Sequence, residues 1–277
     1  MTLDRFIRDY QCNILADGVQ AVIRPPVRSV FEITKSVSGG LNKAVIQFYN
    51  LSSATRLRIV KDAEEFEKDF SISFFLGFQN RIELAFVGSI LRCSNRRMGA
   101  DIVTTIEAYD GGYGVMYRNM SETVETADEA VDAIIANMPR VEKGKITARG
   151  TYSRPKVLEG SIYKCLDSIL NEGETWYIED EKLYITNDRE VADNFVPVVS
   201  AKTGLIGTPE REASIVTFQV LIDPTLKIGR LAKLASTTAP HLNGIYKIQD
   251  VDYSGDNYGN RWQQRCRGIL APEPVYL

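Results

Sequence analysis

The chain is poor in the residues on which most catalytic and metal sites depend. Its 277 residues include one histidine, His241, and four cysteines, Cys12, Cys93, Cys165 and Cys266. Histidine is the side chain most used for acid–base work and metal ligation near neutral pH. The cysteines lie more than 70 residues apart and lack the paired spacing of zinc or dithiol sites. We therefore expect no enzyme, no catalytic residue, no metal site and no cofactor, and four reduced, mostly buried thiols.

Long apolar runs and an excess of one charge are also missing. The most apolar stretch, residues 72–78, is interrupted by Ser73 and Gly77 and is far shorter than the ~20 residues that span a bilayer. Charged residues interrupt the first nine positions, where a secretory signal needs an apolar segment. With 33 Lys+Arg against 36 Asp+Glu, no general basic field attracts DNA or an anionic membrane. We expect cytoplasmic synthesis and assembly, no membrane anchoring, and DNA contact only through a local patch.

What is present is the composition of an ordinary globular protein, with 44% hydrophobic and 25% charged residues. The length exceeds the roughly 100 to 200 residues of a single domain. Strand patterns at both ends flank a middle section with helical period. This predicts three units, at residues 1–111, 112–192 and 193–277, and the hairpin at 176–186 is compatible with either of the last two.

Strands are predicted where apolar residues occupy every second position between turn signals. Tyr10, Cys12 and Ile14 share one face, and Asp17-Gly18 is a tight turn into a second strand, which together indicate a hairpin. Further strands of the first unit are expected at residues 29–35, 43–49, 70–74, 82–86 and 101–109. Those of the last unit are expected at residues 214–221, 229–234, 244–252 and 261–269.

Three helices are expected. Charged helix formers predict one over residues 54–66. Thr126 and Glu129 have the spacing of a capping box and precede an apolar stripe at helical spacing. A third helix is expected to begin at Ser161 and to stop at Gly173.

The short motifs are better explained as turns than as sites. The glycines of Asp110-Gly111-Gly112-Tyr113-Gly114 lack the lysine and helix context of a phosphate loop. His241 follows a proline and precedes an Asn-Gly turn, so we expect an exposed loop histidine. Five residues have the spacing of the first half of a calcium loop, namely Asp250, Asp252, Ser254, Gly255 and Asp256. Arg261 occupies the position of the required bidentate Glu, so a polar turn between strands is expected.

Clustered charges are interpreted as solvated surfaces. Glu64-Glu65 is placed on the charged first helix, and Glu179-Asp180-Glu181 at the tip of a hairpin, whereas a glycosidase needs its carboxylates in a cleft. Arg92, Arg96 and Arg97 are expected at a solvated turn, with contact to passing DNA or an acidic neighbour as the alternative.

The last strand has one uniformly polar face, formed by Arg261, Gln263, Arg265 and Arg267. In a monomer this is the wet side of a sheet, and in a ring it would line a lumen or a subunit contact. The proline-rich end, residues 271–277, is expected to be a docking peptide rather than a fraying tail.

Several segments, in this order, resemble proteins of phage tails. Ala44-Val-Ile-Gln-Phe-Tyr-Asn-Leu-Ser52 resembles the strand-to-helix junction of tail proteins from contractile-tailed phages. Four later segments resemble the C-terminal half of a baseplate hub protein: residues 203–209, 216–224, 243–248 and 255–262. The likeness covers most of the chain and is weakest in the helical middle section.

The resemblance implies a mainly β (β+α) fold with two tube-like β-barrel or sandwich domains and a helical insert between them. It implies a homotrimeric ring that joins the six-fold tail tube, or a tube initiator, to the trimeric spike and contacts other baseplate proteins. DNA would pass only transiently through the lumen, and the protein would reside in the tail baseplate of the virion. No catalytic, cofactor-binding or metal-binding residue is implied.

Two other classes stay open. A tail-associated cell-wall hydrolase would clear a peptidoglycan suspension. A receptor- or carbohydrate-binding β module would gather exposed aromatic side chains in a groove, which the 13 tyrosines permit.

Overall fold

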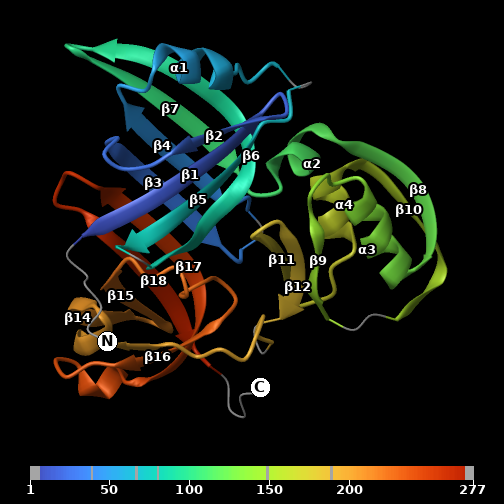
Figure 1. The fold of residues 1–277 in the computed structure, drawn as a ribbon. Helices are drawn as coiled ribbons and strands as arrows, with labels where there is room; N and C mark the ends of the chain where they lie inside the picture. The colour runs from blue at the N-terminus through green and yellow to red at the C-terminus, as the bar shows by residue number, and fades with distance from the viewer. Residues whose placement is uncertain are drawn as a thin grey trace.

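The computed structural model describes residues 7–38, 40–65, 68–79, 81–147, 150–187 and 190–271 (Figure 1). Its main feature is a 13-stranded sheet to which both ends of the chain contribute. The first part of the chain supplies β1 (Arg8–Ala16), β2 (Val19–Ile23), β3 (Ser29–Ser36), β4 (Lys43–Tyr49), β5 (Ser71–Phe78), β6 (Arg81–Met98) and β7 (Asp101–Tyr109). The last part supplies β13 (Val198–Ser200), β14 (Leu205–Glu212), β15 (Ile215–Leu221), β16 (Leu231–Ala235), β17 (Gly244–Asp256) and β18 (Trp262–Leu270).

The two ends of the chain meet where β17 pairs antiparallel with β3. The strand order is β14-β15-β18-β17-β3-β4-β7-β6-β5-β1-β2, with β13 and β16 off this path. The prediction of a mainly β protein is confirmed. The path is open, with β14 and β2 at its ends, so the described strands do not close into a barrel.

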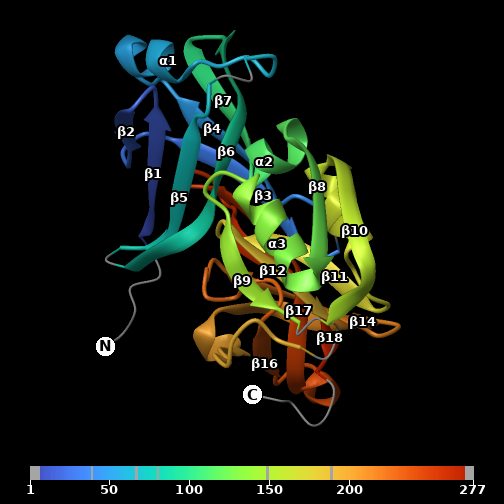
Figure 2. The same cartoon turned by 90° about the vertical axis from the view of Figure 1, so that its right-hand side faces the viewer.

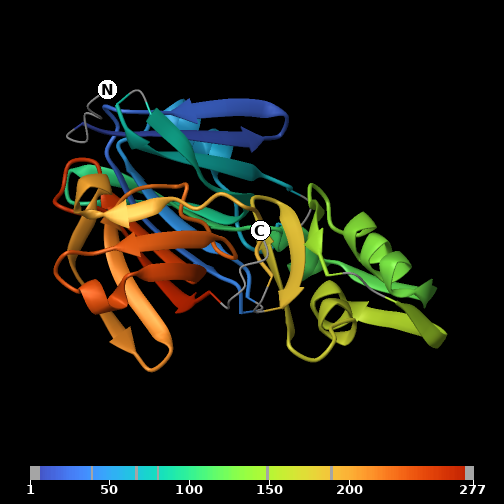
Figure 3. The ribbon, with the colours of Figure 1, turned by 90° about the horizontal axis from the view of Figure 1, so that it is seen from below.

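The sheet folds over a shared core. The Tyr10 ring of β1 lies 6.1 Å from the Phe48 ring of β4, and the Phe74 ring lies 5.2 Å from that of Phe31. Phe31 in turn contacts Trp262 of β18 at 5.3 Å between centroids. One cluster of buried side chains thus spans strands from both parts of the chain. Figures 2 and 3 show these strands as one body with the helical section beside it.

The predicted first hairpin is confirmed. Cys12 of β1 pairs with Ile23 of β2, and the connecting residues Asp17 and Gly18 have φ of 49° and 75°. These left-handed conformations suit Asp and Gly in a two-residue turn. Alternate residues of β1 face the core because successive side chains of a strand point to opposite sides. All four cysteines are free and buried, as predicted.

The first helix is shorter than predicted. α1 (Ser53–Ile59) begins at the cap Ser52 but ends seven residues before the expected end. The backbone of Lys61 instead forms a bridge with Cys93 of β6, with N–O distances of 3.0 and 2.8 Å. The prediction that Glu64 and Glu65 lie on a helix is therefore wrong, because pairing with a distant strand outweighs the local helix propensity.

The middle of the chain forms a separate lobe (Figure 1). Its elements are α2 (Gly112–Tyr117), β8 (Asn119–Thr126), α3 (Ala127–Ala136), β9 (Glu142–Ile146), β10 (Thr151–Ser161), α4 (Ile162–Ser168), β11 (Glu174–Glu179) and β12 (Lys182–Asn187). Two 3-10 turns, η1 (Ala201–Thr203) and η2 (Pro240–Leu242), lie in the last part of the chain. The lobe has its own core cluster.

The helix caps of the lobe match the predictions. Thr126 accepts from the Glu129 backbone N–H at 3.1 Å, and the Glu129 carboxylate accepts from the Thr126 N–H at 3.2 Å. Ser161 caps α4, which ends at Ser168 and so before the expected stop at Gly173. β8, β9 and β10 were not predicted, because their sequences are largely polar and lack a regular apolar alternation.

Candidate assembly surface

The one histidine of the chain, His241, is exposed on η2, as expected for a loop histidine. Among the described residues there is no group of three or more His, Cys, Asp or Glu side chains arranged to hold a metal ion. None of the helices in the described ranges is long and apolar enough to cross a membrane.

The calcium-like residues lie on a strand. Residues 250–256 belong to β17, which pairs with β18 on one side and β3 on the other. An extended strand cannot wrap its side chains around one ion. The expected polar turn is therefore wrong for residues 250–256, and the connection to β18 begins only after Asp256, whose carboxylate pairs with Arg28 at 2.8 Å.

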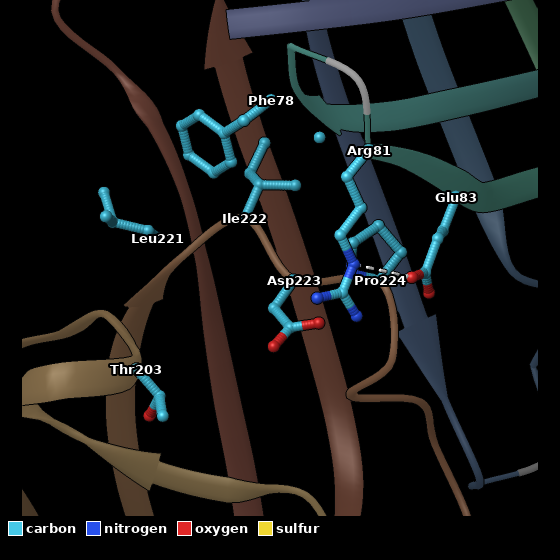
Figure 4. Close-up of a pocket in the computed structure, with 9 residues that line it drawn as sticks. Phe78, Arg81, Glu83, Thr203, Leu221, Ile222, Asp223 and Pro224 are labelled. Atoms are coloured by element: carbon cyan, nitrogen blue, oxygen red, sulfur yellow. Dashed lines mark hydrogen bonds and ion pairs between the residues drawn. The ribbon is translucent and has the colours of Figure 1, made fainter. Parts of the chain in front are cut away.

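A pocket lies where the β5–β6 turn approaches the segment after β15 (Figure 4). Arg81 pairs with Glu83 at 3.2 Å, and its guanidinium points toward the Asp223 carboxylate. Asp223 already accepts from the Thr225 backbone N–H at 3.1 Å. The described residues that line the pocket include no histidine or cysteine, so the pocket offers charged groups that are engaged with their neighbours and no activated nucleophile.

A broad, mostly polar face of the large sheet spans both parts of the chain. In β18, Trp262, Gln264 and Cys266 are buried, whereas Gln263, Arg265 and Arg267 face outward, as the alternation predicts. Directly paired residues of neighbouring strands share a face. Following the pairs from β15 to β6 gives one continuous face across both parts of the chain, which is mostly polar and also carries Val30, Val45, Val103, Tyr109 and Leu221. Its polar side chains are Thr217 and Gln219 (β15), Gln263, Arg265 and Arg267 (β18), Asp250, Asp252 and Ser254 (β17), Glu32 and Thr34 (β3), Lys43 and Gln47 (β4), Thr105 and Glu107 (β7), and Arg92, Ser94 and Arg96 (β6).

The charges on this face are nearly balanced, with five cations and four carboxylates in that set. Lys43 pairs with Glu107 at 2.5 Å, and Arg267 pairs with Asp250 at 3.3 Å. The hydrogen bond from Lys43 lowers the pKa of Glu107. Exposed pairs of this kind contribute only about 0 to 1 kcal/mol each, so their main effect is to keep a broad sheet face hydrophilic.

In the acidic hairpin tip Glu179 is buried and Asp180 and Glu181 are half-buried, so its prediction as a solvated face is wrong. The Glu179 carboxylate accepts from the Lys35 ammonium of β3 at 2.9 Å, and the two side chains are 2% and 1% exposed. Asp180 lies 3.8 Å from Lys35 and also pairs with Lys227. The Asn42 amide donates to Glu179 at 3.1 Å. The β11–β12 turn thus fixes the helical lobe to the large sheet.

Neighbouring groups, some of them half-buried, extend this network. Arg140 of the lobe donates to Glu181 at 3.0 Å and also pairs with Asp69 beside β5. Asp110, which is fully buried, accepts from the Glu181 backbone N–H at 3.0 Å. Burial, together with the Glu179 charge, raises the pKa of Asp110 well above its usual range. The Asp110 turn is therefore part of the lobe attachment, and no phosphate loop forms there.

Comparison with known protein families identifies the family of the chain. Residues 12–264 match the family model described as baseplate hub gp41. The chain belongs to the baseplate hub gp41 family. Membership gives the chain a structural role in a phage tail baseplate. A structural hub family also favours a protein without catalytic activity. No curated protein matches the chain.

Solved structures share the fold at low sequence identity. A tail protein from Neisseria meningitidis MC58 has a TM-score of 0.65 at 9% identity, covering 96% of this chain and 98% of that one. The 43 kDa tail protein of prophage MuSo2 from Shewanella oneidensis has a TM-score of 0.66 at 9% identity, covering 94% and 96%. The E. coli c3393 protein, a component of the type VI secretion system, has a TM-score of 0.64 at 12% identity, covering 94% and 77%.

In this baseplate hub, the arginine cluster lies on a projecting strand pair. Arg92, Arg96 and Arg97 are exposed residues of β6, and the turn itself is at Gly99 and the residue after it. The prediction of a solvated turn is therefore wrong in its placement. We call the two-stranded projection formed by the end of β6 and the start of β7 the β6–β7 arm. Met98 at its end is 57% exposed.

Proposed function

We propose that three copies of the chain form the ring-shaped hub of a phage baseplate. One face of the ring binds the tail tube, the opposite face binds the trimeric spike, and DNA passes through the centre. The observation that carries the proposal is the polar face that runs across strands from both parts of the chain. In a ring built from these sheets, a charge-balanced hydrophilic wall lets DNA pass without being held.

The three-unit division belongs to the same proposal. Residues 1–111 and 193–277 each supply one tube-like unit, so that a trimer offers six such units to a six-fold tube, and residues 112–192 form the insert. Assembly would take place in the host cytoplasm, with the finished protein in the virion tail. The predicted docking peptide at residues 271–277 lies outside the described residues apart from Ala271, which packs beside Leu231.

Light scattering coupled to gel filtration tests the ring. The expected particle has three times the 31.1 kDa mass of one chain, and electron micrographs are expected to show a central channel. Interfaces of obligate oligomers commonly bury roughly 2,000 Å² or more, so the trimer should persist at micromolar concentration. Monomers alone, with or without the tube and spike proteins, would contradict the proposal.

The carbohydrate-binding alternative is less well supported. The large exposed aromatic side chains of the described chain are Tyr163, Phe195 and Tyr258. They lie on α4, before β13, and between β17 and β18. Sugar recognition by stacking needs aromatic side chains gathered in one groove.

A further inference from the structure

Eight strands of the large sheet form an uninterrupted antiparallel row, which ends in an open edge at β14 and in an open stretch over the last part of β6. The row runs β14-β15-β18-β17-β3-β4-β7-β6. At one end, β6 pairs with β5 only as far as Ser89, and a single bridge to Lys61 follows at Cys93. From there to Met98, no other described strand pairs with the side of β6 that faces away from β7.

The other end of the row is β14. It pairs with β15 alone among the described strands. Its ladder is irregular between Ile206 and Glu210, and a second regular stretch follows up to Glu212. Unpaired backbone groups at a sheet edge readily accept another strand unless something covers them. The β6–β7 arm and β14 are therefore two open edges of one sheet.

The directions of the two edges fit each other. Every neighbour in the row is antiparallel, so the strand direction alternates. With eight strands, β14 and β6 run in opposite directions. When a second copy is placed beside the first, its β14 meets β6 as an antiparallel neighbour, which continues the same hydrogen-bonding pattern. Such a contact joins two different surfaces of the chain and can repeat around a closed ring.

The charges of the two edges are complementary. Arg92 and Arg96 lie on the polar face of β6, where they pair across from Glu107 and Val103. Glu210 and Glu212 lie on the same face at β14, across from Thr217 and Ile215. All four are exposed, and none forms an ion pair with another residue in the described ranges. Opposite charges on meeting edges favour encounter and fix which edges pair.

We propose that the β6–β7 arm of one copy docks beside β14 of the next copy, with Arg92 and Arg96 facing Glu210 and Glu212. This rests on the proposed ring, for which it names the contact between copies. Met98, exposed at the end of the arm, and Ile215, exposed on β15 directly across from Glu212, add apolar area to the contact. The polar face then continues from one copy into the next.

Charge reversal tests the contact. Arg92→Glu/Arg96→Glu and Glu210→Arg/Glu212→Arg should each raise the concentration at which the trimer dissociates by about 100-fold or more. The quadruple variant carries both reversals and should regain the trimer. A matched control, Arg24→Glu/Arg154→Glu, makes the same charge change at exposed residues that follow β2 and lie on β10, away from both edges, and should remain a trimer.

The outcomes separate this contact from the ring itself. Sedimentation velocity gives the oligomer, and circular dichroism checks that each variant is folded. If the native chain is a trimer but either double variant dissociates no more than the control, the arm contact is wrong and the ring stands. If both double variants dissociate but the quadruple variant does not regain the trimer, the arm contact is also wrong. If the native chain is not a trimer, the proposed function itself fails.

Discussion

Replacing Lys35 with methionine should strongly destabilise the protein. The ammonium lies in the core, 6.0 Å from the Phe86 ring, and its partner Glu179 is equally buried. Methionine has a similar volume, so the change removes the charge and leaves little cavity. Breaking a buried ion pair by removing one partner typically costs about 3 to 5 kcal/mol, because the other charge stays buried without compensation. Lys227 still neutralises Asp180, so Glu179 carries most of the loss.

Urea unfolding at pH 7 and fixed protein concentration measures this cost. The matched control is Lys43→Met, which removes the same charge from a pair with Glu107 whose side chains are 42% and 30% exposed. The control should lose no more than about 1 kcal/mol. Lys35→Met/Glu179→Leu replaces both buried charges by apolar groups and should recover at least half of the loss.

The pH dependence follows from the same contact. Burial raises the pKa of Glu179, and the Lys35 charge opposes that rise. In Lys35→Met the opposing charge is gone, so the folded-state pKa rises further above the unfolded value. The folded protein then binds a proton more readily than the unfolded chain, which adds stability as the pH falls through the folded pKa. The deficit of the variant should therefore shrink between pH 7 and pH 5. A loss equal to that of Lys43→Met, or a deficit that grows on acidification, would refute a buried pair.

Four further results are expected. Gly229→Ala should cost about 3 kcal/mol or more in urea unfolding, because Gly229 has a φ of 70° and a Cβ there would lie 2.0 Å from the Tyr177 hydroxyl; a neutral effect would contradict the close contact. Thr126→Ala should cost about 1 kcal/mol through loss of the α3 cap, and Thr126→Ser should restore it. Asp110→Asn should stabilise the protein at pH 7 by about 1 kcal/mol and flatten the pH dependence of its stability, because burial raises the pKa of Asp110 and its carboxylate lowers stability above that pKa. A variant whose stability falls with rising pH as steeply as that of the native chain would contradict this. Thiol titration of the native chain should be at least about 100-fold slower than in urea, because burial raises the pKa of Cys93 and Cys266 to about 12.

Local patterns predicted much of the secondary structure. The hairpin through Asp17-Gly18 and the capping box at Thr126 were recognised because each depends on residues within four positions of one another. The resemblance to baseplate hub proteins also came from short segments. One of them, residues 44–52, spans the end of β4 and the cap of α1, which is the strand-to-helix junction it resembled.

Errors arose where a distant partner decided the structure. The helix expected over residues 54–66 ends at Ile59 because Lys61 pairs with Cys93. The polar sequence of β10 carries no strand signal, and its backbone nonetheless pairs with β8. The acidic turn around Glu179 was assigned to solvent, since nothing near it in the sequence points to Lys35, 144 residues away.

The amino-acid sequence by itself determined that this is a mainly β protein of the baseplate hub family, poor in catalytic and metal-binding residues. Side-chain alternation, caps and turn residues act over a few positions and can be read directly. Only the tertiary structure decided that β17 joins β3, that one polar face crosses both parts of the chain, and that the lobe is held by a buried ion pair. These features depend on contacts between residues far apart in sequence, whose energy exists only once the chain has folded.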